Sequence, residues 1–317
     1  MPEMNNSISK IPQHIFNKYI VEKLRVTNPH LAYATDESSY VLDGALVHIP
    51  NAGNSPAVVK NRKSFPATAT MREDTMVMYP LDVFSTDPTH ITWHEANEVS
   101  YAKLDSVLGD HVATLAESVG DNMLYNWVHG YDAQSGEVYI PASHTIKTSG
   151  ADVAVKEQGQ SGTRKAFTYK ELQEAQALMN KQNVPQVDRY AILESYQLQQ
   201  LIDSLSSNQM AAFQQTADLA NGVMGMFAGF KVLERSRVLA FTSAGAPKLP
   251  GEAFEENDNV AALCWQRNSV AKALGETKLF RDVDSPTYYG DIVSALVKMG
   301  GRCRRADWNG LVAIVQG

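Results

Sequence analysis

The residues best suited to metal chemistry are a histidine and two glutamates near residue 95. The run His94-Glu95-Ala96-Asn97-Glu98 begins like the helical zinc motif, in which two histidines four positions apart share one helix face. Position 98 holds Glu98 where the second histidine would be needed, so the ligand pair is missing. The eight histidines are scattered, and none has metal-ligand spacing near a cysteine. We therefore expect neither a metal nor a cofactor.

Three other patterns suggest chemistry and fall short of it. Ser7-Ile8-Ser9-Lys10 matches Ser-x-x-Lys without its companion motifs, and in Gly159-Gln160-Ser161-Gly162 the second glycine comes one residue too early for a nucleophile elbow. No glycine-rich nucleotide loop is present in the sequence. Asp282, Asp284 and Glu255-Glu256 lack the spacing and central glycine of a calcium loop, so charged loop faces account for them better. We expect no catalytic residue.

Two basic clusters remain as candidate contacts between subunits. Lys60, Arg62 and Lys63 form the first, which is either a solvated loop tip or a patch that docks on an acidic neighbour. The second consists of Arg302, Arg304 and Arg305. These arginines either pair with carboxylates across a subunit boundary or are simply exposed.

Bulk composition narrows the class of protein. The 317 residues carry 28 basic and 35 acidic side chains, a net charge of -7, which argues against a dedicated nucleic-acid binder. Two cysteines, Cys264 and Cys303, make no disulfide framework, so we expect reduced thiols. No apolar run is long enough to span a membrane, and the polar N-terminus lacks the core of a signal peptide. We expect a protein made and kept in a cytoplasm.

The first ninety residues are predicted to extend away from any globular core. Residues 1 to about 40 form a polar arm with one amphipathic stretch over residues 15–24. A β-hairpin follows, with strands near Ala45–Ile49 and Thr75–Tyr79, the second continuing to Val83 and Phe84. The connection, Asn51–Arg72, exceeds 20 residues and is polar. Because compact domains rarely keep such loops, it is expected to project and pack on something else.

The strongest single element is a helix predicted over residues 93–128. Its apolar face is made by residues three or four positions apart: Leu104, Leu108, Val112, Leu115, Val119 and Met123. Thr92 and Glu95 have the form of a capping box. Roughly 35 residues at about 1.5 Å each span about 50 Å, longer than a small domain is wide. The sequence therefore predicts one long helix that serves as the spine of the molecule.

The rest of the chain mixes helices and strands. Helices are predicted from Thr168, from Ser195, over 269–274 and over 290–299, the last from composition. Strands are predicted at 138–140, 189–193, within 222–238 and at 260–265. Two closing strands, over 301–315, flank Asp307-Trp308-Asn309-Gly310, in which Asn-Gly favours a hairpin.

This order of elements resembles the Hong Kong 97-like fold of tailed-bacteriophage major capsid proteins. Four segments carry the local resemblance: Ser100 to Leu108 (SYAKLDSVL), Val184 to Leu193 (VPQVDRYAIL), Gly225 to Val232 (GMFAGFKV), and Pro286 to Asp291 (PTYYGD) through Gly310 to Val312. The resemblance covers most of residues 40–317, and the order of the motifs carries more weight than any one of them.

The resemblance implies an α+β fold with an N-arm, an extended β-hairpin E-loop, a P-domain with the long spine helix, and a mixed α/β A-domain. The expected limits are 1–40 for the arm, 41–90 for the E-loop, 91–174 for the P-domain, 175–290 for the A-domain, and 291–317 for closing strands that return to the P-domain. Some relatives join subunits through a lysine and an asparagine. Lys60 or Lys63 lies in roughly that loop, without an assignable partner.

The implied function is structural. Such a subunit assembles with itself as hexamers and pentamers into an icosahedral head, a virion shell that encloses double-stranded DNA without reading its sequence. The short segment before the hairpin predicts a separate scaffolding protein, and a portal and decoration proteins are further expected partners. Two alternatives stay open: the shell of an encapsulin compartment, and a soluble enzyme with an unrecognised site.

Overall fold

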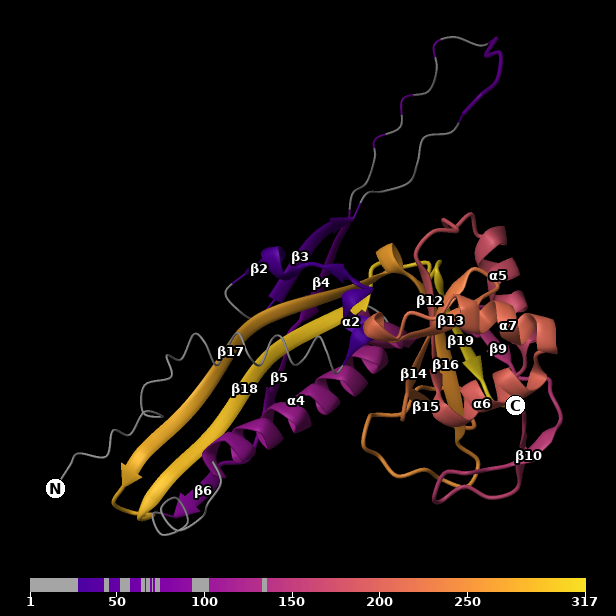
Figure 1. Ribbon diagram of the computed structural model, residues 1–317. Helices are drawn as coiled ribbons and strands as arrows, with labels where there is room; N and C mark the ends of the chain where they lie inside the picture. The colour runs from indigo at the N-terminus through magenta and orange to yellow at the C-terminus, as the bar shows by residue number, and fades with distance from the viewer. Residues whose placement is uncertain are drawn as a thin grey trace.

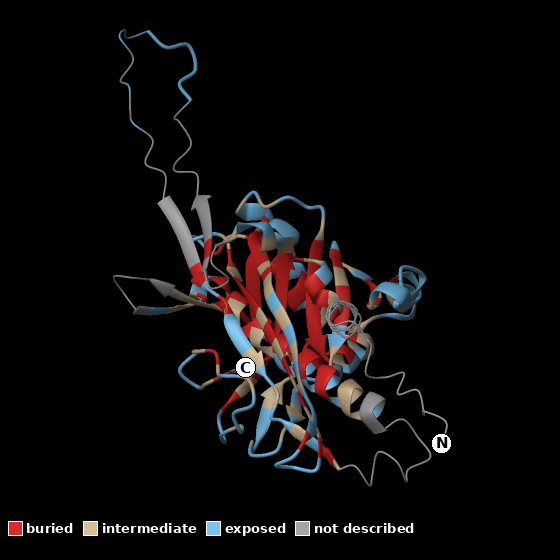
Figure 2. Cartoon of the chain, turned by 90° about the vertical axis from the view of Figure 1, so that its left-hand side faces the viewer, coloured by how far each residue is buried: buried red, intermediate tan, exposed pale blue. Residues whose placement is uncertain are grey.

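The computed structural model of the chain describes residues 28–42, 46–51, 58–63, 66, 69, 71, 75–92, 103–132 and 136–317. Two larger sheets dominate this part of the chain, and a long helix lies against them (Figure 1). Buried residues gather in the middle of the sheets, and the outlying loops are exposed (Figure 2). The predicted stretch over residues 15–24 lies outside the described residues.

The first sheet is built on one long antiparallel pair, β17 (Val270–Ser285) and β18 (Gly290–Cys303). Beside it lie β1 (Thr35–Asp36), parallel to β17, and β5 (Asp82–Ser85) and β6 (Thr89–Thr92), both antiparallel to β18. The hairpin β17–β18 and the helix α4 run side by side toward the second sheet (Figure 1).

The helices predicted over 269–274 and 290–299 are therefore wrong. Both segments are β-strand, and the turn of 3-10 helix before β17 covers only Arg267–Ser269. In β18 every second residue is buried: Val293, Ala295, Val297 and Met299. That period of two is the strand signature, and the sequence concealed it because apolar residues such as Ile292 and Leu296 also occupy the alternate positions.

The spine helix α4 runs from Lys103 to Val128, 26 residues or about 40 Å. It lies within the predicted range, and residues 93–102, with the predicted capping box, lie outside the described residues. Four residues of the predicted apolar face are buried: Val112, Leu115, Val119 and Met123. Near its end, the Trp127 Nε1 donates to the carbonyl of Ala271 at 3.0 Å, which ties the helix to β17.

The second sheet has the order β13 (Val223–Phe227), β14 (Phe230–Arg235), β12 (Arg189–Glu194), β16 (Asn259–Gln266), β19 (Leu311–Val315) and β9 (Thr145–Lys147), with β15 (Leu239–Phe241) on β16. The pairs β12–β14 and β19–β9 are parallel. The strands predicted at 189–193 and 260–265 are confirmed.

Both faces of this second sheet are covered. Ile192 and Trp265 face the core cluster that contains α4, whereas Leu193 and Cys264 face the cluster with the helices. Those helices are α5 (Tyr169–Lys181), α6 (Ser195–Ser204) and α7 (Ser207–Gln215), on the outer side of the sheet (Figure 1). Two-sided burial explains why β12 reads as a continuous apolar run rather than an alternating one. The predicted helices from Thr168 and Ser195 are confirmed.

The predicted extended hairpin is confirmed at its base. The strands β3 (Leu46–Asn51) and β4 (Thr75–Pro80) pair antiparallel, with β2 (Val41–Leu42) beside β3. The second strand does not continue unbroken to Val83 and Phe84, because β4 ends before Leu81 and the chain then starts β5 in the first sheet. Leu81 packs where Gly275 and Gly300 leave room, since a Cβ on either would approach it within 3 Å.

The Asn-Gly hairpin predicted for the closing strands is wrong. The turn exists, with Trp308 at φ 58° and Gly310 at φ 87°. Its two flanking strands do not pair with each other: β18 pairs with strands of the first sheet, and β19 pairs with β16 and β9 of the second. Each finds a longer or more buried partner elsewhere, so the turn passes the chain between sheets.

The remaining described elements are short. They are α2 (Pro29–Ala32), the strand pairs β7 (His129–Asp132) with β8 (Gly136–Tyr139) and β10 (Asp152–Ala154) with β11 (Thr163–Lys165), and turns of 3-10 helix at Ser38–Tyr40, Ala142–His144 and Leu219–Asn221. Within the described ranges, no helix is both long and apolar enough to cross a membrane.

Candidate functional site

Several sequence patterns suggested catalytic or metal-binding side chains. Where the structure describes these side chains, they have structural roles. Ser161 lies in the loop between β10 and β11, where its hydroxyl donates to Glu256 at 2.7 Å. Gly159 and Gly162 have φ of 99° and 82°, so both glycines shape this turn. The pattern at Ser7 to Lys10 and the run from His94 to Glu98 lie outside the described residues.

The acidic residues near position 284 stabilise a strand end. Asp291 accepts from the Arg281 guanidinium at 2.6 Å and from the backbone amide of Asp284 at 3.0 Å. Asp282 and Asp284 are exposed. Among the described residues, no group of three or more His, Cys, Asp or Glu side chains is placed to hold a metal ion.

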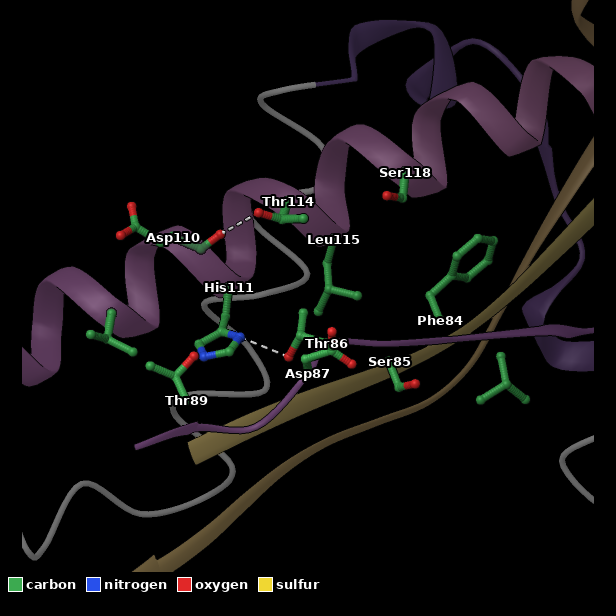
Figure 3. Close-up of a pocket in the computed structure, with 12 residues that line it drawn as sticks. Phe84, Ser85, Thr86, Asp87, Thr89, Asp110, His111, Thr114, Leu115 and Ser118 are labelled. Carbon is green, nitrogen blue, oxygen red and sulfur yellow. Dashed lines mark hydrogen bonds between the residues drawn. The ribbon is translucent and has the colours of Figure 1, made fainter. Parts of the chain in front are cut away.

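A groove of about 630 Å³ runs between α4 and the segment from Val83 to Thr89 (Figure 3). At its floor His111 Nδ1 lies 2.7 Å from Thr86 Oγ1, and burial lowers the pKa of His111. The Thr86 amide donates to the Ala295 carbonyl at 3.0 Å, and Thr86 Oγ1 accepts from the Ala295 amide at 3.0 Å. The histidine thus connects the spine helix to β18 through one threonine, which is a structural role.

The first basic cluster lies at a turn far from both sheets. Residues 58–63, which include Lys60, Arg62 and Lys63, are all exposed and stand well away from the packed part of the molecule (Figure 1). Val58 beside them is 95% exposed, which is high for a valine. Among the described residues, none of the three cations has a carboxylate within ion-pair distance. The turn presents apolar and positive groups together.

The second basic cluster is not one patch. Arg305 forms two bonds to Asp307, at 2.8 and 2.6 Å, and this contact lowers the pKa of Asp307 to about 2. Arg304 Nε lies 2.7 Å from Glu37 Oε1, and burial lowers the pKa of Arg302. Arg304 and Arg305 therefore have carboxylate partners within their own chain. A role of the three between subunits stays a prediction.

Sequence reasoning missed a charged junction that joins three distant segments. At the end of β14, Arg235 bonds to Asp121 of α4 with Nε at 2.9 Å and Nη2 at 2.7 Å. Arg235 also donates to the Asn28 side chain, whose Nδ2 donates to the Ala116 carbonyl at 2.7 Å. Arg235 and Asp121 lie 114 positions apart, so no local pattern could have paired them.

Comparison with known proteins identifies the family. The sequence model of a family described as phage capsid protein matches residues 130–314, more than half of the chain. No curated protein matches the sequence.

Three solved structures illustrate the similarity of fold. Mycobacterium phage Che8 is 16% identical, with 89% of each chain covered and a TM-score of 0.53. The capsid of Ralstonia phage GP4 is 12% identical over 89% of this chain and 86% of that one, with a TM-score of 0.60. The capsid of cyanophage Pam1 is 12% identical over 89% and 87%, with a TM-score of 0.61.

These likenesses confirm the α+β, Hong Kong 97-like fold expected from the sequence. The family match covers α5 to α7 and nearly all of the second sheet. The family match and the likeness of fold show that the chain belongs to the phage capsid protein family and is a structural protein of the virion rather than an enzyme.

Proposed function

We propose that this chain is the main building block of an icosahedral phage head, assembling as hexamers and pentamers of itself around double-stranded DNA. The observation that carries the proposal is the β3–β4 hairpin. Its base is built into the molecule, while the turn of residues 58–63 is exposed and holds Val58 and three cations. A surface with apolar and positive groups suits an acidic neighbour, and the chain itself carries a net charge of -7. Another copy of the chain is the natural partner.

The domain limits are part of the proposal, adjusted by strand pairing. The starting limits are residues 1–40 for the arm, 41–90 for the E-loop, 91–174 for the P-domain and 175–290 for the A-domain, and strand pairing changes two of these assignments. Because β17 pairs along its length with β18, we assign both strands to the P-domain. Because β19 pairs with β16, residues 311–315 belong with the A-domain sheet.

Deletion of Asn51–Arg72 tests the proposal. The base strands β3 and β4 have partners within the chain, so the shortened subunit is expected to fold and stay soluble. It should form no particles when purified protein is examined by negative-stain microscopy, whereas the full chain forms closed shells. Normal shells from the deletion variant would refute the role of the hairpin, and a full chain that stays monomeric even beside its scaffolding protein would refute the proposal itself.

A charge variant separates the length of the hairpin from its chemistry. Replacing Lys60, Arg62 and Lys63 by serine keeps the chain length and removes three positive charges. If these groups dock on an acidic neighbour, assembly should slow and lose most of its sensitivity to salt, because ionic contacts are screened. Unchanged assembly would indicate that these three residues are only a solvent-exposed loop tip.

The remaining partners are proposed as classes. A separate scaffolding protein, a portal and decoration proteins would each be recovered with particles made in infected cells and identified by mass spectrometry. A co-purifying enzyme cargo in place of DNA would instead favour an encapsulin-type compartment.

A further inference from the structure

A buried carboxylate, that of Glu37, lies beside the base of the hairpin. Glu37 follows β1 and is 1% exposed. A carboxylate this buried is costly unless its oxygens are paired, because burial removes its hydration. Its surroundings therefore indicate what it holds in place.

The groups around Glu37 come from three parts of the chain. Tyr79, near the end of β4, donates its hydroxyl to Glu37 Oε2 at 2.9 Å. Arg304, which follows β18, places Nε 2.7 Å from Glu37 Oε1. The Glu37 amide donates to the Lys272 carbonyl of β17 at 2.8 Å. One residue thus connects a hairpin strand with both long strands of the first sheet.

Neighbouring contacts extend this connection into a strap. The Ser38 hydroxyl accepts from the Leu274 amide of β17 at 2.9 Å, and Val41 pairs with Val47 of β3. A small apolar cluster of Val47, Tyr79, Leu81 and Ala273 lies beneath. Residues 35–42 therefore cross from β17 to the hairpin, with Glu37 on the sheet side and Val41 on the hairpin side.

We propose that Glu37 is the positioning residue that sets the direction in which the β3–β4 hairpin leaves the first sheet. Two short chain links join the hairpin to this sheet: Leu81 between β4 and β5, and residues 37–40 between β1 and β2. Neither link alone defines an angle. The Tyr79–Glu37–Arg304 contact joins the two, because Glu37 lies in one link and Tyr79 lies two residues before the other, and two links held together define a direction.

The protonation of Tyr79 agrees with this role. Burial, followed by the nearby Glu37 carboxylate, raises the pKa of Tyr79, so the phenol keeps its proton and can donate it. Burial also raises the pKa of Glu37, while the Tyr79 hydroxyl and the Arg304 guanidinium oppose that shift. The phenol therefore stays in the state that its hydrogen bond to Glu37 needs, whereas burial outweighs the two partners of Glu37 and leaves the pKa of that carboxyl raised.

The inference deepens the proposed assembly function, since a hairpin that reaches a neighbouring subunit must leave its own at a defined angle. Three variants test it. Tyr79→Phe removes one hydroxyl and keeps the ring, Glu37→Gln keeps an acceptor for Tyr79 and removes the charge, and Glu37→Ala removes both. The control is Asp291→Asn, which weakens the 2.6 Å pair with Arg281 on the same sheet, beyond the hairpin.

Backbone hydrogen exchange of the unassembled subunit is the first measurement. Tyr79→Phe and Glu37→Ala should speed exchange in β3 and β4 by about tenfold or more, because a hydrogen bond to a charged group is lost at the point of attachment. Exchange in β16 should not change, Glu37→Gln should fall between, and the Asp291→Asn control should leave the hairpin as it was. If Glu37→Ala does not fold, the other two variants decide.

Unchanged exchange in β3 and β4 for Tyr79→Phe and Glu37→Gln would overturn the inference. An equal increase in β16 would also overturn it, because it would show a general loss of stability and not a local one. Light scattering during assembly is the second measurement, and the variants should assemble more slowly than the unaltered chain. If the unaltered chain forms no shells, the proposed function fails, while the exchange experiment still judges the role of Glu37.

Discussion

Arg235 offers a sharp test of how the spine helix is held to the second sheet. The change Arg235→Met keeps much of the side-chain volume and removes the guanidinium. It leaves Asp121 without the two bonds of 2.9 and 2.7 Å, and leaves the Glu117 carbonyl without its donor at 3.1 Å. It also removes the partner of the Asn28 side-chain oxygen.

The size of the effect follows from burial. The side chains of Arg235 and Asp121 are 11% and 17% exposed, so neither is well hydrated. Removing one partner from a buried ion pair costs about 3–5 kcal/mol, because the other charge is left uncompensated. Asp121 keeps some contact with water, which places the expected loss at the lower end, about 3 kcal/mol. That is roughly a 150-fold fall in the folding equilibrium constant.

Urea unfolding of the unassembled subunit measures the loss, and a double-mutant cycle assigns it to the pair. Asp121→Asn in the Arg235→Met background should recover a large part of the stability, because no unpaired charge remains. Lys165→Met is the matched control: its 2.9 Å pair with Asp152 is exposed, and its loss should cost under about 1 kcal/mol. A loss of stability for Arg235→Met as small as that of this control would refute the reasoning. A double variant whose loss equals the sum of the two single-variant losses would also refute it.

Two further predictions concern titratable groups. Burial raises the pKa of Cys264 far above its usual range and that of Cys303 to about 11, so neither thiol should react with a chromogenic disulfide reagent at pH 8 until urea unfolds the chain; rapid reaction of the folded protein would contradict the burial of both. Burial and then the nearby Glu157 raise the pKa of Glu194 to about 7. The folded state therefore holds a proton that the unfolded state releases near pH 4.5, so this contribution to stability is fully present below that pH and is lost as pH rises to about 7. Glu194→Gln should remove up to about 3 kcal/mol of that decline in urea unfolding across this range, and parallel curves for both proteins would argue against it.

Much of the fold was predictable where the pattern is local. The apolar positions of α4 recur at helical spacing, and Val112 to Met123 point to one core because 3.6 residues make a turn. Thr168 and Glu171 form the capping box of α5, with the Thr168 amide donating to the Glu171 carboxylate at 2.7 Å. Such signals involve residues within a few positions of each other, and sequence order alone brings them together.

The candidate contacts were predictable only in part. Lys60, Arg62 and Lys63 are adjacent in sequence and stay together in an exposed turn. Arg302, Arg304 and Arg305 are just as close in sequence, yet the structure sends two of them to different carboxylates. The difference lies in their surroundings, since an exposed turn has no packed neighbours to divide its side chains among.

What the sequence determined by itself is the set of local periods: a long amphipathic helix, two-sided apolar strands, and an overlong polar connection between hairpin strands. Tertiary structure alone decided which strands pair and which charges meet. It made 290–299 a strand because β17 was available as a partner, and it split the closing strands between two sheets. It also brought Glu37 to Arg304 across 267 positions. Contacts at that range depend on the packed whole, because no short window of sequence contains both partners.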